Sequence, residues 1–108
     1  MTTVVHVVCY GSASLREKIV KDERLSRYGL QVSRQKISGR NPGWAKLHAV
    51  EHEIFGAINL EWDGPTKTLL ARVVTRGRGK PDAILGRYIA YLLARHRHRI
   101  RSIEIHPD

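Results

Sequence analysis

The stretch AINLEWDGPTKTLLARVVT, residues 57–75, predicts two strands joined by a tight turn. Apolar and polar residues alternate from Ala57 to Trp62, as they do in a strand with one buried face. Residues 63–66, with the sequence DGPT, have the composition of a turn, and residues 67–75 resume a strand-like pattern. The segment therefore predicts a β-hairpin.

Strand and helix patterns alternate on both sides of the hairpin. Residues 3–9 are rich in valine and residues 30–37 alternate, so each segment is a predicted strand. The capping-box pair Ser14 and Glu17 predicts the start of a helix that runs to Tyr28, with Gly29 as its stop. Its apolar pattern is weak after Asp22, so the second half is expected to fray or kink.

The C-terminal third of the chain predicts one more helix and one more strand. Residues 81–97 have a helical pattern that opens with Pro81 and Asp82. Residues 100–106 predict a last strand with Ile103 and Ile105 on one face. Residues 44–55 fit a short helix or a strand, and the strand is slightly favoured because it would extend the sheet.

This order of elements predicts a single basic α+β domain over residues 1–108. We expect a two-layer sandwich with a ferredoxin-like split βαβ arrangement, to which residues 44–55 add an extra middle strand or short helix. In this prediction the strands that precede the two helices, residues 3–9 and 67–75, form a central parallel pair.

Composition restricts the class of protein. The chain has 19 Lys and Arg against 10 Asp and Glu, a formal net charge of +9, and 42% hydrophobic residues. This balance is too apolar for a disordered chain. The positive charge is consistent with a polyanionic partner and equally with a soluble protein that has a basic surface and no specific anion. Cys9 is the sole cysteine, which excludes an internal disulfide. Residues 1–10 lack a signal-peptide pattern and residues 83–94 are too short for a membrane span, so we expect a cytoplasmic protein.

The segment RHRHR, residues 95–99, closes the last predicted helix. Cations at a helix C-terminus each gain about 0.3–1 kcal/mol from the helix dipole, so helix termination explains most of this row. A helical wheel separates His96 from His98, which argues against a metal site between them, and it places Tyr91 on the solvent side. The buried stripe is expected to consist of Leu85, Ile89, Leu92, Leu93 and His96.

The start of the same helix carries cations where the helix dipole is already positive. Residues 76–80, with the sequence RGRGK, combine three cations with glycines that let a ligand approach the backbone, so we interpret them as an anion cradle. In the predicted arrangement they meet the turn at residues 11–14. The alternative is a solvated basic loop. The expected phosphate ligands are Ser12, Ser14, Arg34, Lys36, Arg40, Arg76, Gly77, Arg78, Gly79 and Lys80.

Two patterns suggest catalysis or metal binding, and both are weak. Residues 48–52 fit H-x-x-E-H, in which two helical histidines hold zinc, but a wheel turns Glu51 away from the histidines. Cys9 is interpreted as a small buried side chain rather than a nucleophile. We therefore predict no catalytic residue, no cofactor and no stoichiometric zinc.

Three functional hypotheses remain. The leading one is a non-enzymatic protein that binds the phosphate backbone of RNA or DNA. The second is a small oligomeric module, such as a homodimer, that binds an anionic metabolite or an acidic protein. The third is an RNA-cleaving enzyme that uses His48, His52 or Tyr10 as acid or base. Trp44 and Trp62 are interpreted as core or interface residues rather than as stacking platforms for bases.

Overall fold

Among the described residues, more lie in strands than in helices. The computed structural model describes residues 2–36, 44–75 and 81–107. The strands are β1 (Thr2–Cys9), β2 (Leu30–Lys36), β3 (Trp44–Ala49), β4 (Ala57–Asp63), β5 (Thr68–Val74) and β6 (Ile100–His106). The α-helices are α1 (Leu15–Val20) and α2 (Asp82–Arg95), and the 3-10 helices are η1 (Leu25–Tyr28) and η2 (Arg97–Arg99).

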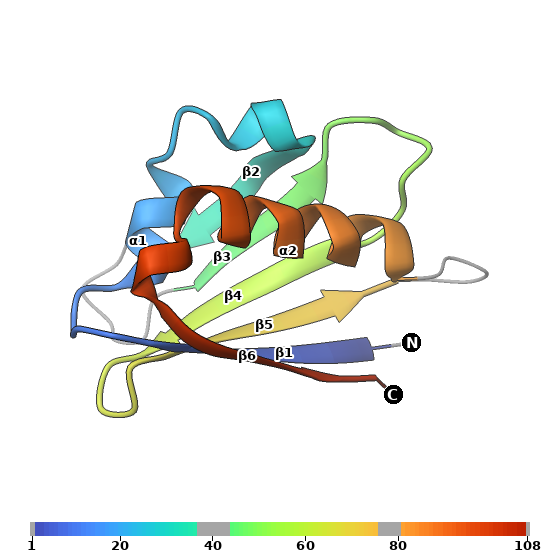
Figure 1. The fold of residues 1–108 in the computed structure, drawn as a ribbon. Helices are drawn as coiled ribbons and strands as arrows, with labels where there is room; N and C mark the ends of the chain where they lie inside the picture. The colour runs from blue at the N-terminus through green and yellow to red at the C-terminus, as the bar shows by residue number, and fades with distance from the viewer. Residues whose placement is uncertain (1, 37–43, 76–80, 108) are drawn as a thin grey trace.

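The strands form one six-stranded sheet in the order β2-β3-β4-β5-β1-β6. Each neighbouring pair is antiparallel. Figure 1 shows both α-helices on the same face of this sheet. The described residues thus have the α+β composition that the sequence predicts, with the helices over one face of an antiparallel sheet.

The predicted hairpin is confirmed. β4 and β5 pair from Ala57 opposite Val74 to Asp63 opposite Thr68, and residues 64–67 connect them. The segment 44–55 begins as strand β3, which pairs with both β2 and β4. It therefore supplies the extra middle strand, which was the favoured of its two interpretations.

The expected parallel pairing of the strands that precede the two helices is wrong. β1 and β5 are neighbours, but they are antiparallel, with Thr2 opposite Val74 and Val8 opposite Thr68. The chain crosses from β1 to a parallel β2 and then reverses three times, from β2 to β3, β4 and β5. An odd number of reversals leaves β5 antiparallel to β1.

The two helical connections each join strands that are parallel but not adjacent. β5 and β6 both pair antiparallel with β1, which lies between them, so α2 spans a split βαβ unit. α1 and η1 connect β1 to β2 across three intervening strands. The split βαβ part of the prediction is therefore present between β5 and β6, whereas the parallel central pair is not.

The first helical segment is shorter than predicted. Ser14 caps α1, because its Oγ accepts a hydrogen bond from the Glu17 amide at 3.2 Å, as the capping pattern predicted. α1 then ends at Val20, and η1 follows in place of a helix that continues to Tyr28. Gly29 ends η1 with a φ of 76°, a left-handed conformation that favours glycine. The weak apolar pattern after Asp22 thus corresponds to a break between two segments.

α2 buries a face that overlaps only partly with the one predicted, since Leu92 is buried as expected but the centre of the face is rotated. Its fully buried side chains are Ile84, Tyr88, Tyr91 and Leu92. Tyr91, expected on the solvent side, is among them, whereas Leu93 is 37% exposed and Leu85 and Ile89 are only partly buried. Apolar residues surround much of this helix, so the sequence pattern alone does not determine its rotation. His96 is buried, as predicted.

The hydrophobic core lies between the helices and one face of the sheet. α1 contributes Leu15 and Ile19, both inaccessible to solvent. β1, β3, β4 and β5 each contribute alternate residues, as expected for strands with one face toward the core, and β2 contributes Leu30. The fully buried strand residues are Val5, Val7, Leu30, Ala45, Leu47, Ile58, Leu60, Leu69, Ala71 and Val73.

Candidate functional site

The sheet face opposite the helices, here called the open face, carries the polar strand residues. In β1 and β4 the helix-side residues are buried and the intervening residues are partly exposed. β3 alternates in the same way. Successive side chains of a strand point to opposite faces, so Trp44, Lys46 and His48 project from the open face. A ligand can reach this face because no described element packs over it (Figure 1).

The strand register aligns several polar residues of the open face. Lys46 is opposite Asn59 of β4, and Asn59 is opposite Arg72 of β5. Neighbouring strands lie about 4.8 Å apart, so the Lys46 and Arg72 positions are about 10 Å apart. We call the cross-strand row of Lys46, Asn59 and Arg72 the cationic row. Beyond these three residues, the same register line continues to Arg34 of β2 on one side and to Val4 of β1 and His106 of β6 on the other.

A hollow lies beside the cationic row. Its volume is about 550 Å³, and Lys46, Asn59 and the aromatic ring of Phe55 contribute to its lining. Phe55 is 66% exposed. An exposed ring next to an ammonium group and an amide can stack on a planar ligand while the ammonium binds an anion. The remaining lining residues are His48, Gly56, Ala57 and Val74.

Ser33 orients His48 at the edge of this hollow. The register of β2 against β3 shifts between Val32 and Arg34, so Ser33 is the extra residue of a bulge. Its Oγ donates a hydrogen bond to the Lys46 carbonyl at 3.2 Å and lies 2.5 Å from His48 Nδ1, which therefore acts as the donor to Ser33. Partial burial and the Lys46 ammonium lower the pKa of His48, which favours the neutral imidazole.

The starts of α1 and α2, which were expected to converge, follow opposite ends of the β1–β5 pair. β5 ends at Val74, opposite Thr2 at the start of β1. Gly11 and Ser12 follow the other end of β1, because the two strands are antiparallel. Ser14, another predicted ligand, caps α1.

The other predicted phosphate ligands divide into two groups. Arg34 and Lys36 lie in β2, opposite Lys46 and Trp44 of β3. They are thus beside the cationic row rather than beside the turn at residues 11–14. Arg40 and residues 76–80 lie outside the described residues.

The structure brings together only two of the three residues considered for RNA cleavage. His48 and His52 line a second hollow of about 260 Å³. The strand register aligns His48 with Thr2, at the start of β1, through Ala57 and Val74. Tyr10 follows the other end of β1, roughly 26 Å along the strand from Thr2. The H-x-x-E-H interpretation requires a helix, but His48 is in strand β3 and Glu51 forms an ion pair with Arg87.

Residues 95–99 mainly stabilise the chain itself. Arg97 Nε donates to the Leu93 carbonyl at 3.2 Å, in the last turn of α2, which confirms a role in helix termination. Arg99 reaches across to the connection after β1, where it donates to the carbonyls of Tyr10 at 2.9 Å and Ala13 at 2.7 Å. These cations therefore do not present one continuous surface to a partner.

A polar network connects the segment after α1 to the end of α2. Asp22 Oδ2 accepts hydrogen bonds from Tyr91 Oη at 2.8 Å and Arg95 Nε at 3.3 Å. Tyr91 Oη lies 2.8 Å from His96 Nε2, from which it accepts a hydrogen bond. Burial raises the pKa of Asp22, but hydrogen bonds from the Arg24 amide, Tyr91 and Arg95 outweigh it and leave the pKa below its ordinary value. Burial lowers the pKa of His96.

Cys9 does not have the environment of a nucleophile. It is 4% exposed, and its Sγ lies 3.6 Å from the Val7 carbonyl. Burial raises the pKa of the thiol, although the nearby Arg99 charge acts in the other direction. The interpretation of Cys9 as a buried core side chain is confirmed.

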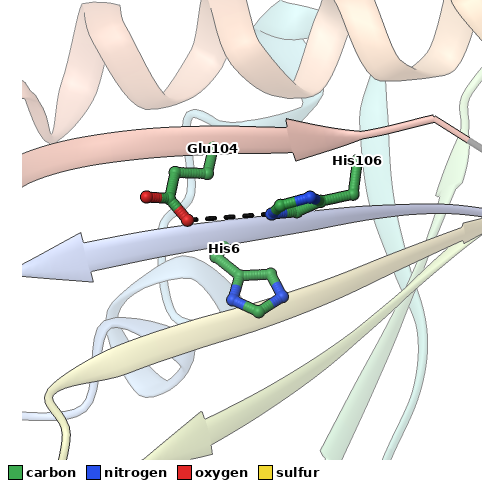
Figure 2. A group of neighbouring side chains, drawn as sticks. All are labelled: His6, Glu104 and His106. Atoms are coloured by element: carbon green, nitrogen blue, oxygen red, sulfur yellow. Dashed lines mark ion pairs between the residues drawn. The ribbon is translucent and has the colours of Figure 1, made fainter.

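The end of the open face formed by β1 and β6 carries a group that the sequence analysis missed. His6 of β1 lies beside Glu104 and His106 of β6, and Figure 2 shows the three side chains gathered together. The available signal was the spacing of Glu104 and His106, which places both on one face of a strand. No sequence pattern links these residues to His6, which is far away along the chain.

No protein-family model, curated protein or solved structure matches this chain. Among the described ranges, neither helix is long and apolar enough to cross a membrane.

Proposed function

We propose that the protein binds single-stranded nucleic acid on the open face of its sheet. The observation that carries the proposal is the cationic row, in which Lys46 and Arg72 flank Asn59, next to the exposed rings of Trp44 and Phe55. The cationic row and the adjacent aromatic rings provide the two interactions by which proteins bind single strands, which are phosphate contacts and base stacking.

The phosphate contacts come from Lys46 and Arg72 in this proposal. Lys46 has no ion pair among the described residues, so its ammonium is available to a phosphate. Arg72 NH1 contacts Glu61 Oε1 at 2.9 Å, which leaves its other donors for a ligand. Arg34 and Lys36 of β2 are the register neighbours of Lys46 and Trp44. The formal net charge of +9 favours approach of a polyanion.

The base contacts come from Trp44 and Phe55. Trp44, which the sequence analysis assigned to the core or an interface, is 36% exposed and stands at the start of β3 on the open face. Base stacking on an aromatic side chain contributes about 1–3 kcal/mol per base. Bases in a duplex are already stacked on one another, so these rings favour single strands.

We also propose that the order β4-β5-β1-β6 with α1 and α2 is a ferredoxin-like unit, to which β2 and β3 are added at one edge. The split unit β5-α2-β6 around β1 supports this proposal. The addition of β3 is what brings Trp44, Lys46 and His48 to the open face.

Titration of labelled oligonucleotides tests the function. We expect the chain to bind single-stranded RNA or DNA more tightly than a duplex of the same length, with an affinity that falls steeply with salt. The double variant Lys46→Gln and Arg72→Gln should weaken binding and reduce the log–log salt slope by about 0.7 for each lost phosphate contact. Lys18→Gln with Lys21→Gln is the matched control, because it removes the same charge from α1 and its C-terminal cap residue, on the helix side.

Fluorescence separates stacking from charge. Trp62 is buried and Trp44 is not, so quenching of tryptophan emission by an oligonucleotide should disappear in Trp44→Phe. Trp44→Ala should weaken binding to RNA but not to inorganic polyphosphate, which has no bases. Equal losses in the open-face variant and the α1 control would refute the site, since the protein would then respond only to total charge.

A further inference from the structure

The three side chains at the β1–β6 end of the open face are placed by strand register. His6 is opposite Glu104, and Val4 is opposite His106, so the two histidines are diagonal neighbours across the strand pair. Glu104 and His106 are two positions apart in β6 and therefore share one face. Backbone pairing, rather than flexible loops, thus positions all three residues (Figure 2).

The distances between the side chains suit one bound ion. Each residue offers a ligand atom, and these atoms all lie within 4.8 Å of one another. Glu104 Oε2 and His106 Nε2 are 3.7 Å apart, and the two imidazole centroids are 5.0 Å apart with an interplanar angle of 64°. Tetrahedral zinc with ligand bonds of about 2.0–2.2 Å needs donor atoms about 3.3–3.6 Å apart, so small side-chain rotations close the site.

We propose that His6, Glu104 and His106 bind one divalent transition-metal ion, with Zn²⁺ the ion that this ligand set favours. Two imidazoles and one carboxylate match the ligand preferences of zinc and its first-row neighbours, whereas Mg²⁺ and Ca²⁺ prefer oxygen ligands. The proposal reverses the sequence-based expectation of no metal site. It does not depend on nucleic-acid binding.

The site leaves coordination positions open toward solvent. The side chains of Glu104 and His106 are 60% and 58% exposed, and His6 is partly exposed on the same face. Three protein ligands on an accessible surface leave room for water or for an anionic ligand on the ion. Among the described residues, this is the one group of three or more such side chains whose ligand atoms are close enough to share an ion.

A metal here also connects the edge strand to its neighbour. β6 pairs only with β1 among the described strands, and the ion would join side chains from both. An ion that binds the folded chain and not the unfolded chain stabilises it by mass action. Thermal unfolding therefore gives a readout of binding that is independent of any activity.

The test uses the full chain without a histidine tag, after treatment with a chelator. Calorimetric titration with Zn²⁺ should give one ion per chain, and Zn²⁺ should raise the melting temperature. Titration with Co²⁺ should give visible absorption bands of a tetrahedral or five-coordinate ion. His106→Ala and Glu104→Gln should each weaken Zn²⁺ binding by at least about tenfold, since loss of a direct ligand exceeds the 10–100-fold effect of outer-shell changes.

Two controls make the result decisive. His98→Ala removes an exposed histidine of η2 and should leave Zn²⁺ binding unchanged. Both altered ligands are exposed, so circular dichroism should show folded variants. Absence of Zn²⁺ binding to the wild-type chain would overturn the proposal. The proposal would also be overturned if wild type and His106→Ala bound Zn²⁺ with equal affinity. The same holds if Mg²⁺ displaced Zn²⁺ when both ions are present at the same concentration.

Discussion

Asp22 is the residue on which the polar contacts at the end of α2 converge. Its side chain is 8% exposed and accepts hydrogen bonds from Tyr91, Arg95 and the Arg24 amide. A buried carboxylate with several donors is stable, but each donor loses its partner if the charge is removed. The network also explains why Tyr91 is buried rather than exposed, since its hydroxyl has a partner inside the protein.

We expect Asp22→Asn to lower the free energy of unfolding at pH 7 by about 1–3 kcal/mol, the usual cost of disrupting hydrogen bonds to a charged group. Urea denaturation measures this value. Glu23→Gln is the matched control, because Glu23 is an exposed neighbour, and it should change stability by less than about 0.5 kcal/mol. Similar losses in the two variants would contradict the role of the network.

The same variant has a defined pH dependence. The pKa of Asp22 is lower in the folded chain than its ordinary value of about 3.9, so the stabilisation is complete above that value and is lost as pH falls through the folded pKa. The stability difference between wild type and Asp22→Asn should therefore be constant from pH 7 to about 5 and shrink below about pH 4. A constant difference at the lowest pH that permits folding would disprove this assignment.

At the scale of elements, two glycines have opposite roles. Gly29 ends η1 in the left-handed region, and a Cβ there would overlap the guanidinium of Arg87, which donates to the Gly29 carbonyl at 3.2 Å and pairs with Glu51. Gly86 lies inside α2, and a Cβ there meets no described atom within 4 Å. One glycine is required by its conformation and contacts, and the other only weakens its helix.

Gly29→Ala should destabilise the protein by more than about 1 kcal/mol, because a left-handed alanine costs about 1–2 kcal/mol before the displacement of Arg87 is counted. Gly86→Ala should stabilise it by about 0.5–1 kcal/mol through helix propensity. Thermal melts of both variants test the pair. If both substitutions destabilised the protein, the contrast between the left-handed Gly29 and the helical Gly86 would be refuted.

At the scale of the whole molecule, the open face has two chemically different ends. The β2–β5 side carries Lys46 and Arg72, whereas the β1–β6 side carries two histidines and Glu104. Contacts between distant parts of the chain also hold the molecule together. Arg99 is the clearest case, since it joins the end of η2 to the connection after β1.

We expect Arg99→Gln to lower the free energy of unfolding by about 1 kcal/mol, since it removes two hydrogen bonds between segments that are far apart in sequence. Arg97→Gln removes the same charge, but its hydrogen bond is to Leu93 within the same turn, so its effect should be within about 0.5 kcal/mol. Chemical denaturation of both variants makes the comparison. An equal effect of the two variants would mean that the cations of residues 95–99 stabilise the protein only through the helix dipole.

The features that the sequence predicted correctly are those that depend on neighbours along the chain. The β4–β5 hairpin, the Ser14 cap and the Gly29 stop each follow from a short pattern. Such features form within a few residues, so composition and periodicity suffice to locate them. The two faces of β1 are likewise evident from its alternation, because a strand has a side-chain period of two.

Tertiary structure decided which elements are neighbours and in which direction they run. The antiparallel pairing of β1 and β5 separated the two connections that had been expected to form one anion site. The rotation of α2 depended on packing, because its apolar residues allow more than one buried stripe. The juxtaposition of His6 with Glu104 and His106 arose only from the β1–β6 register. Local patterns specify the faces of an element, but only the assembled sheet determines which faces meet.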